Sequence, residues 1–392
     1  MKQKVIMIIH TDYPWKEGMS YRVHQMAYRL AVKYDVTVVA PILENSSSAL
    51  RESFGSYQVL RIPIPLYVSE RVKSNRLLLR LIFMIFFTFS MVRVWKSVSI
   101  CRVKLIQAEQ QLSLLPALVL SLLLKVPLIV DDALAFEKYY EHSPNYIKSV
   151  AWMFEMLLFH SCRLIISSSW SAGQSFPEAF KISPSKIRVV PNGVESVSVL
   201  NQRPEANKES KDVVFTASMY SPQNLRAINN LVKIFADVSK EIETARLFII
   251  GGPTHMLGNE HLKEIKKLHN VFILGRISEE EKNRYLISAH VCPQPFDPKD
   301  KLMGGIRLKS LECLAYGKVV ISTSSGVEGI IGAIDGVNLI ISDNFEEFKK
   351  RMVDVLKHPE RYEEIQRNAV QLAGKYQWEN ILQPYLKIVD KI

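Results

Sequence analysis

The chain has 392 residues, of which 48% are hydrophobic and 23% charged, and its net charge is +11. This length favours two domains over a single core, and four widely separated cysteines argue against a structural zinc site, a disulfide framework and an oxidising compartment. The positive charge favours a partner that carries phosphate. Because the sequence contains no nucleic-acid-binding motif, the expected partner is an anionic membrane surface or a phosphorylated ligand, and binding to nucleic acid is not expected.

The first half alternates short apolar runs with helical patterns. The N-terminal run is too short for a signal peptide, and the apolar stretches 77–92 and 112–130 are interrupted by Arg80, Pro116 and Lys125, so no transmembrane helix is expected. Continuous apolar strands separated by helices are typical of a parallel sheet covered on both faces. The predicted strands are 5–9, 36–40, 57–62, 103–107, 127–132, 163–168 and 187–191.

A polar segment over 199–211 has no apolar periodicity and is predicted to be a linker. A second strand–helix alternation follows, with strands at 213–218, 246–252, 271–275, 290–295, 319–323 and 338–342. The fold class is therefore α/β, with two Rossmann-like, doubly wound domains facing across a cleft. The predicted domains are 1–198 and 212–375, and the helix in 376–392 is expected to pack back on the first domain.

Residues 71–104 contain eight Lys and Arg side chains, no acidic residue and the apolar run 81–92. A basic and apolar helix of this kind can lie on an anionic membrane surface. The alternative is a core helix with charged, solvated ends. Under the first interpretation the protein is cytoplasmic and peripheral on the inner face of the cell membrane.

The segment 304–323 predicts a glycine loop, a helix over 306–316 and a buried strand. Arg307 and Lys309 fall in the first helical turn, where the helix dipole is positive, and Glu312 follows one turn later. Such an arrangement can hold a phosphate and offer a carboxylate to a sugar hydroxyl. The alternatives are solvated charges for the two cations and an ion pair with Lys309 for Glu312.

Four segments of the sequence, 5–31, 187–195, 215–228 and 304–323, together resemble the family 4 retaining glycosyltransferases, which have the two-domain GT-B fold and use nucleotide sugars. The resemblance extends over nearly the whole chain. It implies donor-binding roles for two sets of residues: Gly18 and Arg22 in the first domain, and Ser218, Asn224, Arg226, Gly251, Arg276, Gly304, Gly305, Arg307, Lys309 and Glu312 in the second.

Within this set, the resemblance assigns Arg307 and Lys309 to the diphosphate and Glu312 to the ribose hydroxyls. The first acid of the family's glutamate pair is replaced by Gly304, so the identity of the sugar cannot be carried over. For several of these residues a purely structural role is the alternative to donor binding. Gly18 can be a plain turn glycine, and Asn224 can cap the helix that follows it.

Asp131 and Asp132 end a predicted strand of the first domain and are the candidate catalytic residues, as carboxylates that orient an acceptor hydroxyl or the sugar ring. The alternative is an acidic pair at a helix N-terminus. By resemblance, the acceptor attacks the front face of the sugar and the leaving phosphate takes its proton. No cofactor is then required beyond the nucleotide-sugar co-substrate, and without a DxD motif no essential metal is expected.

The resemblance thus implies a glycosyltransferase of the hexosyltransferase type. It would move a sugar from a nucleotide-diphosphate sugar, with UDP-sugars as one class of donor, to a glycan or lipid-linked acceptor. The resemblance also implies that the sugar retains its anomeric configuration and that the product is a surface polysaccharide. Two alternatives stay open. One is a non-catalytic subunit that binds nucleotide sugars, and the other is a nucleotide-sugar epimerase of the same fold.

Overall fold

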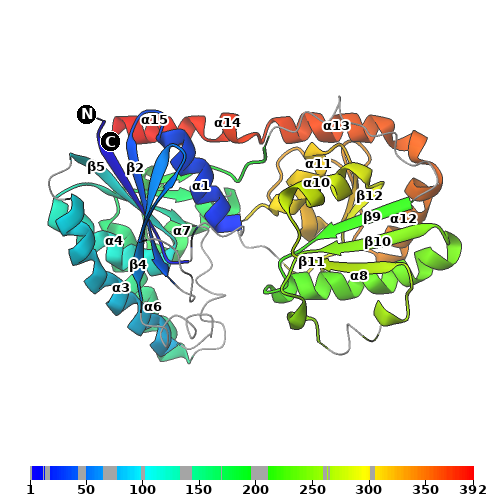
Figure 1. Ribbon diagram of the computed structural model, residues 1–392, viewed down its shortest axis with the longest axis horizontal. Coiled ribbons are helices and arrows are strands. Elements are labelled where there is room, and N and C mark those ends of the chain that lie inside the picture. The colour runs from blue at the N-terminus through cyan, green and yellow to red at the C-terminus, as the bar shows by residue number, and fades with distance from the viewer. Residues whose placement is uncertain are drawn as a thin grey trace. The chain divides into compact units, whose positions relative to one another are not determined.

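A computed structural model of the chain forms two compact units (Figure 1). Unit 1 comprises Met1–Pro191, Met303–Gly305 and Leu382–Ile392, and unit 2 comprises Asn192–Leu302 and Ile306–Ile381. The structure describes residues 2–11, 13, 18–42, 50–64, 77–98, 102–132, 144–168, 170–195, 211–258, 263, 265–300 and 305–392.

Unit 1 is built on an eight-stranded sheet with the order β3-β4-β2-β1-β5-β6-β7-β8. All neighbouring strands are parallel except β3, which pairs antiparallel with β4 at one edge. The strands are β1 (Lys4–Ile9), β2 (Asp35–Ile42), β3 (Arg51–Phe54), β4 (Tyr57–Pro63), β5 (Val103–Glu109), β6 (Leu128–Asp132), β7 (Leu164–Ser167) and β8 (Ile187–Val189).

Helices cover both faces of this sheet, which is why β1 is buried at every position and β2 at every position but its two ends. The face with Ile6, Ile8 and Ile106 packs against one helical layer, α3 (Leu77–Val98), α4 (Gln111–Leu124), α6 (Asn145–Ser161) and α7 (Trp170–Phe180). α1 (Gly18–Leu30) packs on β1 and β2. No helix in the described part of the chain is long and apolar enough to cross a membrane.

Unit 2 has a six-stranded parallel sheet with the order β11-β10-β9-β12-β13-β14. Its strands are β9 (Lys211–Thr216), β10 (Ala245–Ile250), β11 (Val271–Gly275), β12 (Val291–Gln294), β13 (Val319–Ser322) and β14 (Ile340–Ile341). Its α-helices are α8 (Pro222–Glu241), α10 (Glu279–Ser288), α11 (Leu308–Ala315), α12 (Phe345–Lys357), α13 (Glu363–Gly374) and α14 (Trp378–Ile381).

Among the parallel strands of each sheet the strand order reverses direction at one place, between β1 and β5 in unit 1 and between β9 and β12 in unit 2. The loops at the carboxyl ends of the two central strands diverge there, so ligands of open α/β sheets bind at such a point. Both candidate clusters described below contain residues from these strand ends.

The predicted α/β class with two parallel sheets is confirmed. The antiparallel edge strand β3 was not predicted, and β5 continues two residues beyond the predicted end, as far as Glu109. The predicted linker lies outside the described residues except Lys211, which begins β9. The last helix, α15 (Gln383–Lys391), belongs to unit 1, where Tyr385 is buried and Asp390 pairs with Lys33.

Candidate functional site

In unit 2 two cations lie against aromatic rings close to the switch point. The Arg307 guanidinium carbon lies 3.5 Å from the centre of the Phe296 ring. The Lys309 ammonium lies 5.3 Å from the same ring and 4.9 Å from the ring of Phe215 on β9. Neither cation forms an ion pair with a carboxylate in the described part of the chain. Two neighbouring positive charges on an apolar base are suited to an anion that carries more than one charge.

α11 positions these two cations. The helix begins at Leu308, and Arg307 is its N-cap residue, so the prediction that Arg307 lies inside the first turn was wrong by one residue. Ser310, Leu311, Cys313 and Leu314 bury one face of the helix. Gly317, at φ +61°, allows the chain to turn into β13, as predicted. Gly305 is half-buried before the helix, and Gly304 lies outside the described residues.

Burial lowers the pKa of both cations. Arg307 is 7% exposed, and its guanidinium donates to the carbonyl oxygens of Ser325 at 3.2 Å and Asp300 at 3.5 Å, which are neutral acceptors. Desolvation lowers the pKa of Arg307 to about 10. Desolvation, together with the positive charge of Arg307, lowers the pKa of Lys309 to about 7. An anion bound here would favour the charged form of Lys309.

Asn224 links this cation pair to the end of β9. Its Oδ1 atom accepts a hydrogen bond from Lys309 at 2.9 Å, and its Nδ2 atom donates to the carbonyl of Ser218 at 2.7 Å. The N-cap of α8 is Ser221, so the alternative that Asn224 caps this helix is wrong. Ser218 is exposed. Arg226, two residues further along α8, makes a two-pronged ion pair with Asp300.

Glu312 faces α10 and does not pair with Lys309. Its Oε1 atom accepts a hydrogen bond from Lys282 at 2.7 Å, and Lys282 also pairs with Glu279 at 2.8 Å. The Glu312 side chain stays 25% exposed, so it can still accept a hydrogen bond from a ligand hydroxyl. Burial alone would lower the pKa of Lys282, but the two carboxylates outweigh it and raise this pKa above its ordinary value.

Gly251 and Arg276 lie at the carboxyl ends of β10 and β11. Gly251 has φ +130°, and a Cβ atom there would lie 1.9 Å from the carbonyl oxygen of Ala217. The Gly251 amide donates to the carbonyl of Gly275 at 2.7 Å. The predicted main-chain contact to the nucleotide base would therefore have to come from another main-chain atom of this turn. Arg276 is exposed and lies beside Gly252.

One buried polar residue at this site was not predicted. Gln294 ends β12 and is fully buried, and neither its Oε1 nor its Nε2 atom has a hydrogen-bond partner within the described residues. A buried amide without partners is costly, and such groups are rare in folded proteins. In the sequence, only the position of Gln294 at the end of a central strand, two residues before Phe296, could have marked it as a site residue.

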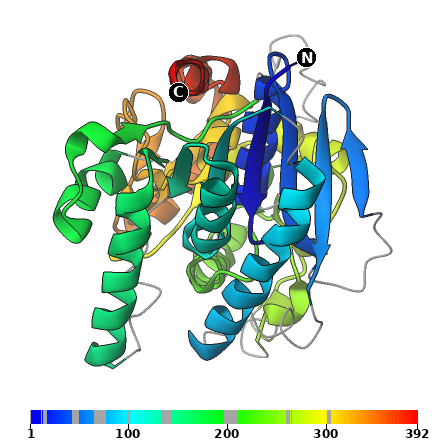
Figure 2. The same cartoon turned by 90° about the vertical axis from the view of Figure 1, so that its left-hand side faces the viewer.

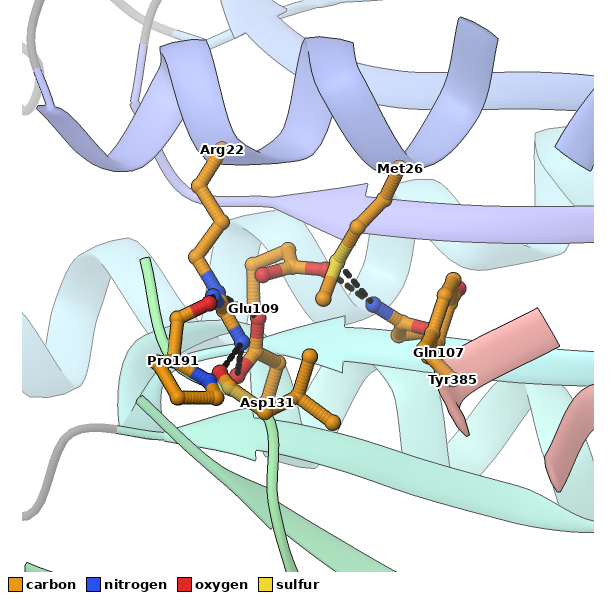
Figure 3. A network of polar contacts seen from close by, with 8 residues as sticks. Arg22, Met26, Gln107, Glu109, Asp131, Pro191 and Tyr385 are labelled. Atoms are coloured by element: carbon orange, nitrogen blue, oxygen red, sulfur yellow. Dashed lines mark hydrogen bonds and ion pairs between the residues drawn. The ribbon is translucent and has the colours of Figure 1, made fainter. Parts of the chain in front are cut away.

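In unit 1 the buried ion pair of Arg22 and Asp131 lies at the carboxyl end of the inner strand β6 (Figure 3). Arg22 reaches down from α1, and its Nε and Nη2 atoms donate to both carboxylate oxygens of Asp131, at 2.6 and 3.1 Å. It also donates to the carbonyls of Val190 and Pro191. The Arg22 guanidinium therefore contacts the Asp131 carboxylate and the main chain at Val190 and Pro191. Gly18 is the first residue of α1.

Glu109 and Gln107 connect the region of this ion pair to the C-terminal helix α15. Glu109 is 1% exposed and accepts a hydrogen bond from Gln107 Nε2 at 2.6 Å, while Tyr385 of α15 donates to Gln107 Oε1 at 2.6 Å (Figure 3). Burial, and next the negative charge of Asp131, raise the pKa of the Glu109 carboxyl well above its ordinary value. Asp132 is also buried, at the last position of β6. The residues that follow Asp132 lie outside the described part.

Two protein-family models match the chain. The model described as "Glycosyltransferase Family 4" matches residues 16–196, and the model described as "Glycosyl transferases group 1" matches residues 210–358. Together they span most of both units. A comparison with curated protein sequences finds no match.

Solved structures with the same two-domain fold cover the whole chain at low identity. Sucrose-phosphate synthase from Thermosynechococcus elongatus has a TM-score of 0.75 and 15% identity, covering 100% of this chain and 99% of its own. HepE from Anabaena, solved with UDP and glucose, has a TM-score of 0.73 and 15% identity, covering 100% of both chains. A UDP-forming trehalose-phosphate synthase from Burkholderia xenovorans has a TM-score of 0.74 and 9% identity, covering 99% of this chain and 100% of its own.

Proposed function

Because the chain belongs to the glycosyltransferases that these two family models describe, we propose that it transfers a sugar from a nucleoside-diphosphate sugar to a glycan or lipid-linked acceptor, with retention of configuration. We further propose that this transfer serves the synthesis of a surface polysaccharide. The observation that carries the donor assignment is the pair of the buried Arg307 and the half-buried Lys309, two cations without a carboxylate partner in the described part of the chain.

The proposed chemistry follows from the charge that develops on the donor. As the bond to the sugar breaks, the nucleoside diphosphate gains negative charge, and preorganised cations stabilise that charge most in the transition state. Arg307 and Lys309 supply these cations. The acceptor hydroxyl attacks the anomeric carbon and passes its proton to the departing phosphate oxygen. Glu312 binds a ribose hydroxyl through the oxygen that Lys282 leaves free.

The two first-domain carboxylates receive different roles in this proposal. Asp131 places both oxygens on Arg22, so we assign it a positioning role. Asp132 remains the candidate for orienting the acceptor hydroxyl. No metal ion is needed in this scheme, and transfer should therefore continue in EDTA.

The first test is thermal stabilisation by UDP, GDP and ADP and their sugars. UDP-glucose is the first probe, since HepE was solved with UDP and glucose. A ligand at about 100 times its Kd adds roughly 2.7 kcal/mol of stability. One base should stabilise the wild type but not Glu312→Ala. Glu346→Ala is the matched control, because it removes an exposed glutamate paired with a lysine in the same unit.

Activity is then followed by NMR with that nucleotide sugar and a panel of acceptors. Release of nucleoside diphosphate with a product of the donor's anomeric configuration supports retaining transfer. Conversion of the sugar without an acceptor would identify an epimerase, and binding without turnover on any acceptor would favour a non-catalytic subunit. Absence of stabilisation by every nucleotide would contradict the donor assignment.

A further inference from the structure

Three helices of unit 1 present large apolar side chains to solvent. α3 and α6 lie on either side of α4, on the same face of the sheet (Figure 2). These helices contribute ten of the nineteen exposed large hydrophobic side chains in the described part of the chain. The ten are Ile85, Phe86, Phe89 and Val92 on α3, Leu122 and Leu123 on α4, and Tyr146, Val150, Met153 and Leu157 on α6. We call this set the helical apolar surface.

The core of unit 1 does not account for these side chains. α3 already buries Phe83, Phe87 and Met91 in the core, and Phe89, which is 73% exposed, lies on its other side. On α6, Leu158 and Phe159 face the core, while the exposed residues recur at a spacing of three and four along the opposite side. A helix that is apolar on all sides is normally buried all round, so a second apolar environment is expected over this surface.

The charges around the surface are of one sign. α3 and α4 contain no acidic residue, and the single carboxylate of α6, Glu155, is 4% exposed. Arg93, Lys96 and Lys125 are exposed basic residues on these helices or at their ends. Residues 1–195 contain 23 Lys and Arg against 14 Asp and Glu, so most of the net charge of +11 belongs to this part of the chain.

We propose that the helical apolar surface docks on the face of an anionic lipid bilayer. The apolar side chains enter the boundary between headgroups and acyl chains, and the basic residues contact the lipid phosphates. A second copy of the chain is the alternative occupant. The lipid is favoured because a symmetric contact would bring the Arg93 and Lys96 side chains of two copies together without an exposed carboxylate on these helices to neutralise them. Docking of this surface on a bilayer does not depend on the donor site.

The test is co-sedimentation of the full chain with vesicles of equal parts phosphatidylglycerol and phosphatidylcholine, and with vesicles of phosphatidylcholine alone. Val150→Ser combined with Leu157→Ser removes apolar area from α6, and Phe89→Ser does so on α3. The matched control is Ile331→Ser with Ile334→Ser, which are 61% and 55% exposed in unit 2. Sedimentation velocity without lipid measures self-association of each variant.

The wild type and the control should bind the anionic vesicles, and raising the salt should weaken that binding. The α6 pair should reduce the partition coefficient about tenfold or more, because two exposed apolar side chains no longer leave water. A cooperative thermal transition without ligand, close to that of the wild type, shows that the variant is folded. Equal binding by all variants, or no binding by the wild type, overturns the proposal. A dimer that the α6 pair dissociates would assign the surface to a second copy instead. If vesicles bind but no nucleotide stabilises the protein, the donor proposal fails and the lipid proposal stands.

Discussion

The ammonium of Lys282 lies 2.7 Å from Oε1 of Glu312, although the two residues are thirty positions apart and belong to different helices. Lys282 is held at the same time by Glu279 at 2.8 Å. This contact fixes one oxygen of the carboxylate and leaves the other for a ligand. Lys282 therefore orients Glu312 before a ligand binds.

Lys282→Met is expected to weaken nucleotide binding about tenfold without unfolding unit 2, because a hydrogen bond to a charged group contributes roughly 1.5 kcal/mol. Glu312 is then free to take other rotamers. Calorimetric titration with the stabilising nucleotide measures the effect. Arg284→Met is the control, since it breaks an exposed ion pair on the same helix. An affinity equal to that of the wild type would show that Glu312 is oriented without Lys282.

The depressed pKa of Lys309 predicts that donor affinity depends on pH. With a pKa of about 7, Lys309 loses its charge as pH rises, whereas a bound diphosphate requires that charge. The affinity for a nucleotide sugar should fall above pH 7, towards about tenfold per pH unit, since each binding event must take up a proton. Lys309→Met should bind weakly and without this dependence. A flat wild-type profile between pH 6.5 and 8.5 would contradict the assignment.

The same shift has the opposite consequence for the stability of the free protein. The unfolded chain, in which lysine titrates near 10.5, binds more protons than the folded chain above pH 7. The contribution of Lys309 to stability therefore rises as pH increases from about 7 towards 10.5. A ligand-free thermal scan of the wild type should show this rise relative to Lys309→Met.

Gln294 offers a test that separates binding from stability. Replacing it by Met keeps a similar shape and removes two buried polar atoms that lack partners in the described part of the chain. The variant should be more stable than the wild type, by about 1–3 kcal/mol, because the cost of the unsatisfied amide disappears. If the amide contacts the donor, nucleotide affinity should fall at the same time. A less stable Gln294→Met would show that the amide is satisfied in the free protein.

The strands were predictable because buried parallel strands need continuous apolar runs, and 5–9 and 319–323 are such runs. The apolar pattern of α11 and its glycine end were equally local properties of the sequence. The partners of the charged residues were not predictable. Arg22 and Asp131 are 109 positions apart, and only the packing of α1 on the sheet brings them together. Glu109 was missed because the strand pattern appeared to end at Gln107.

The buried carboxyl of Glu109 leads to the last prediction. Burial, and next Asp131, raise its pKa, so the folded protein holds a proton that the unfolded chain releases above its ordinary carboxyl pKa. Stability present at acid pH is therefore lost as pH rises through the window between the ordinary and the raised pKa. Glu109→Gln keeps the oxygen that accepts from Gln107 Nε2 and cannot ionise. It should melt higher than the wild type at neutral pH and close to it near pH 4. Glu178→Gln, on α7 and away from this network, is the control. A lower melting temperature for Glu109→Gln at neutral pH would show instead that a charged Glu109 is stabilised by Arg22.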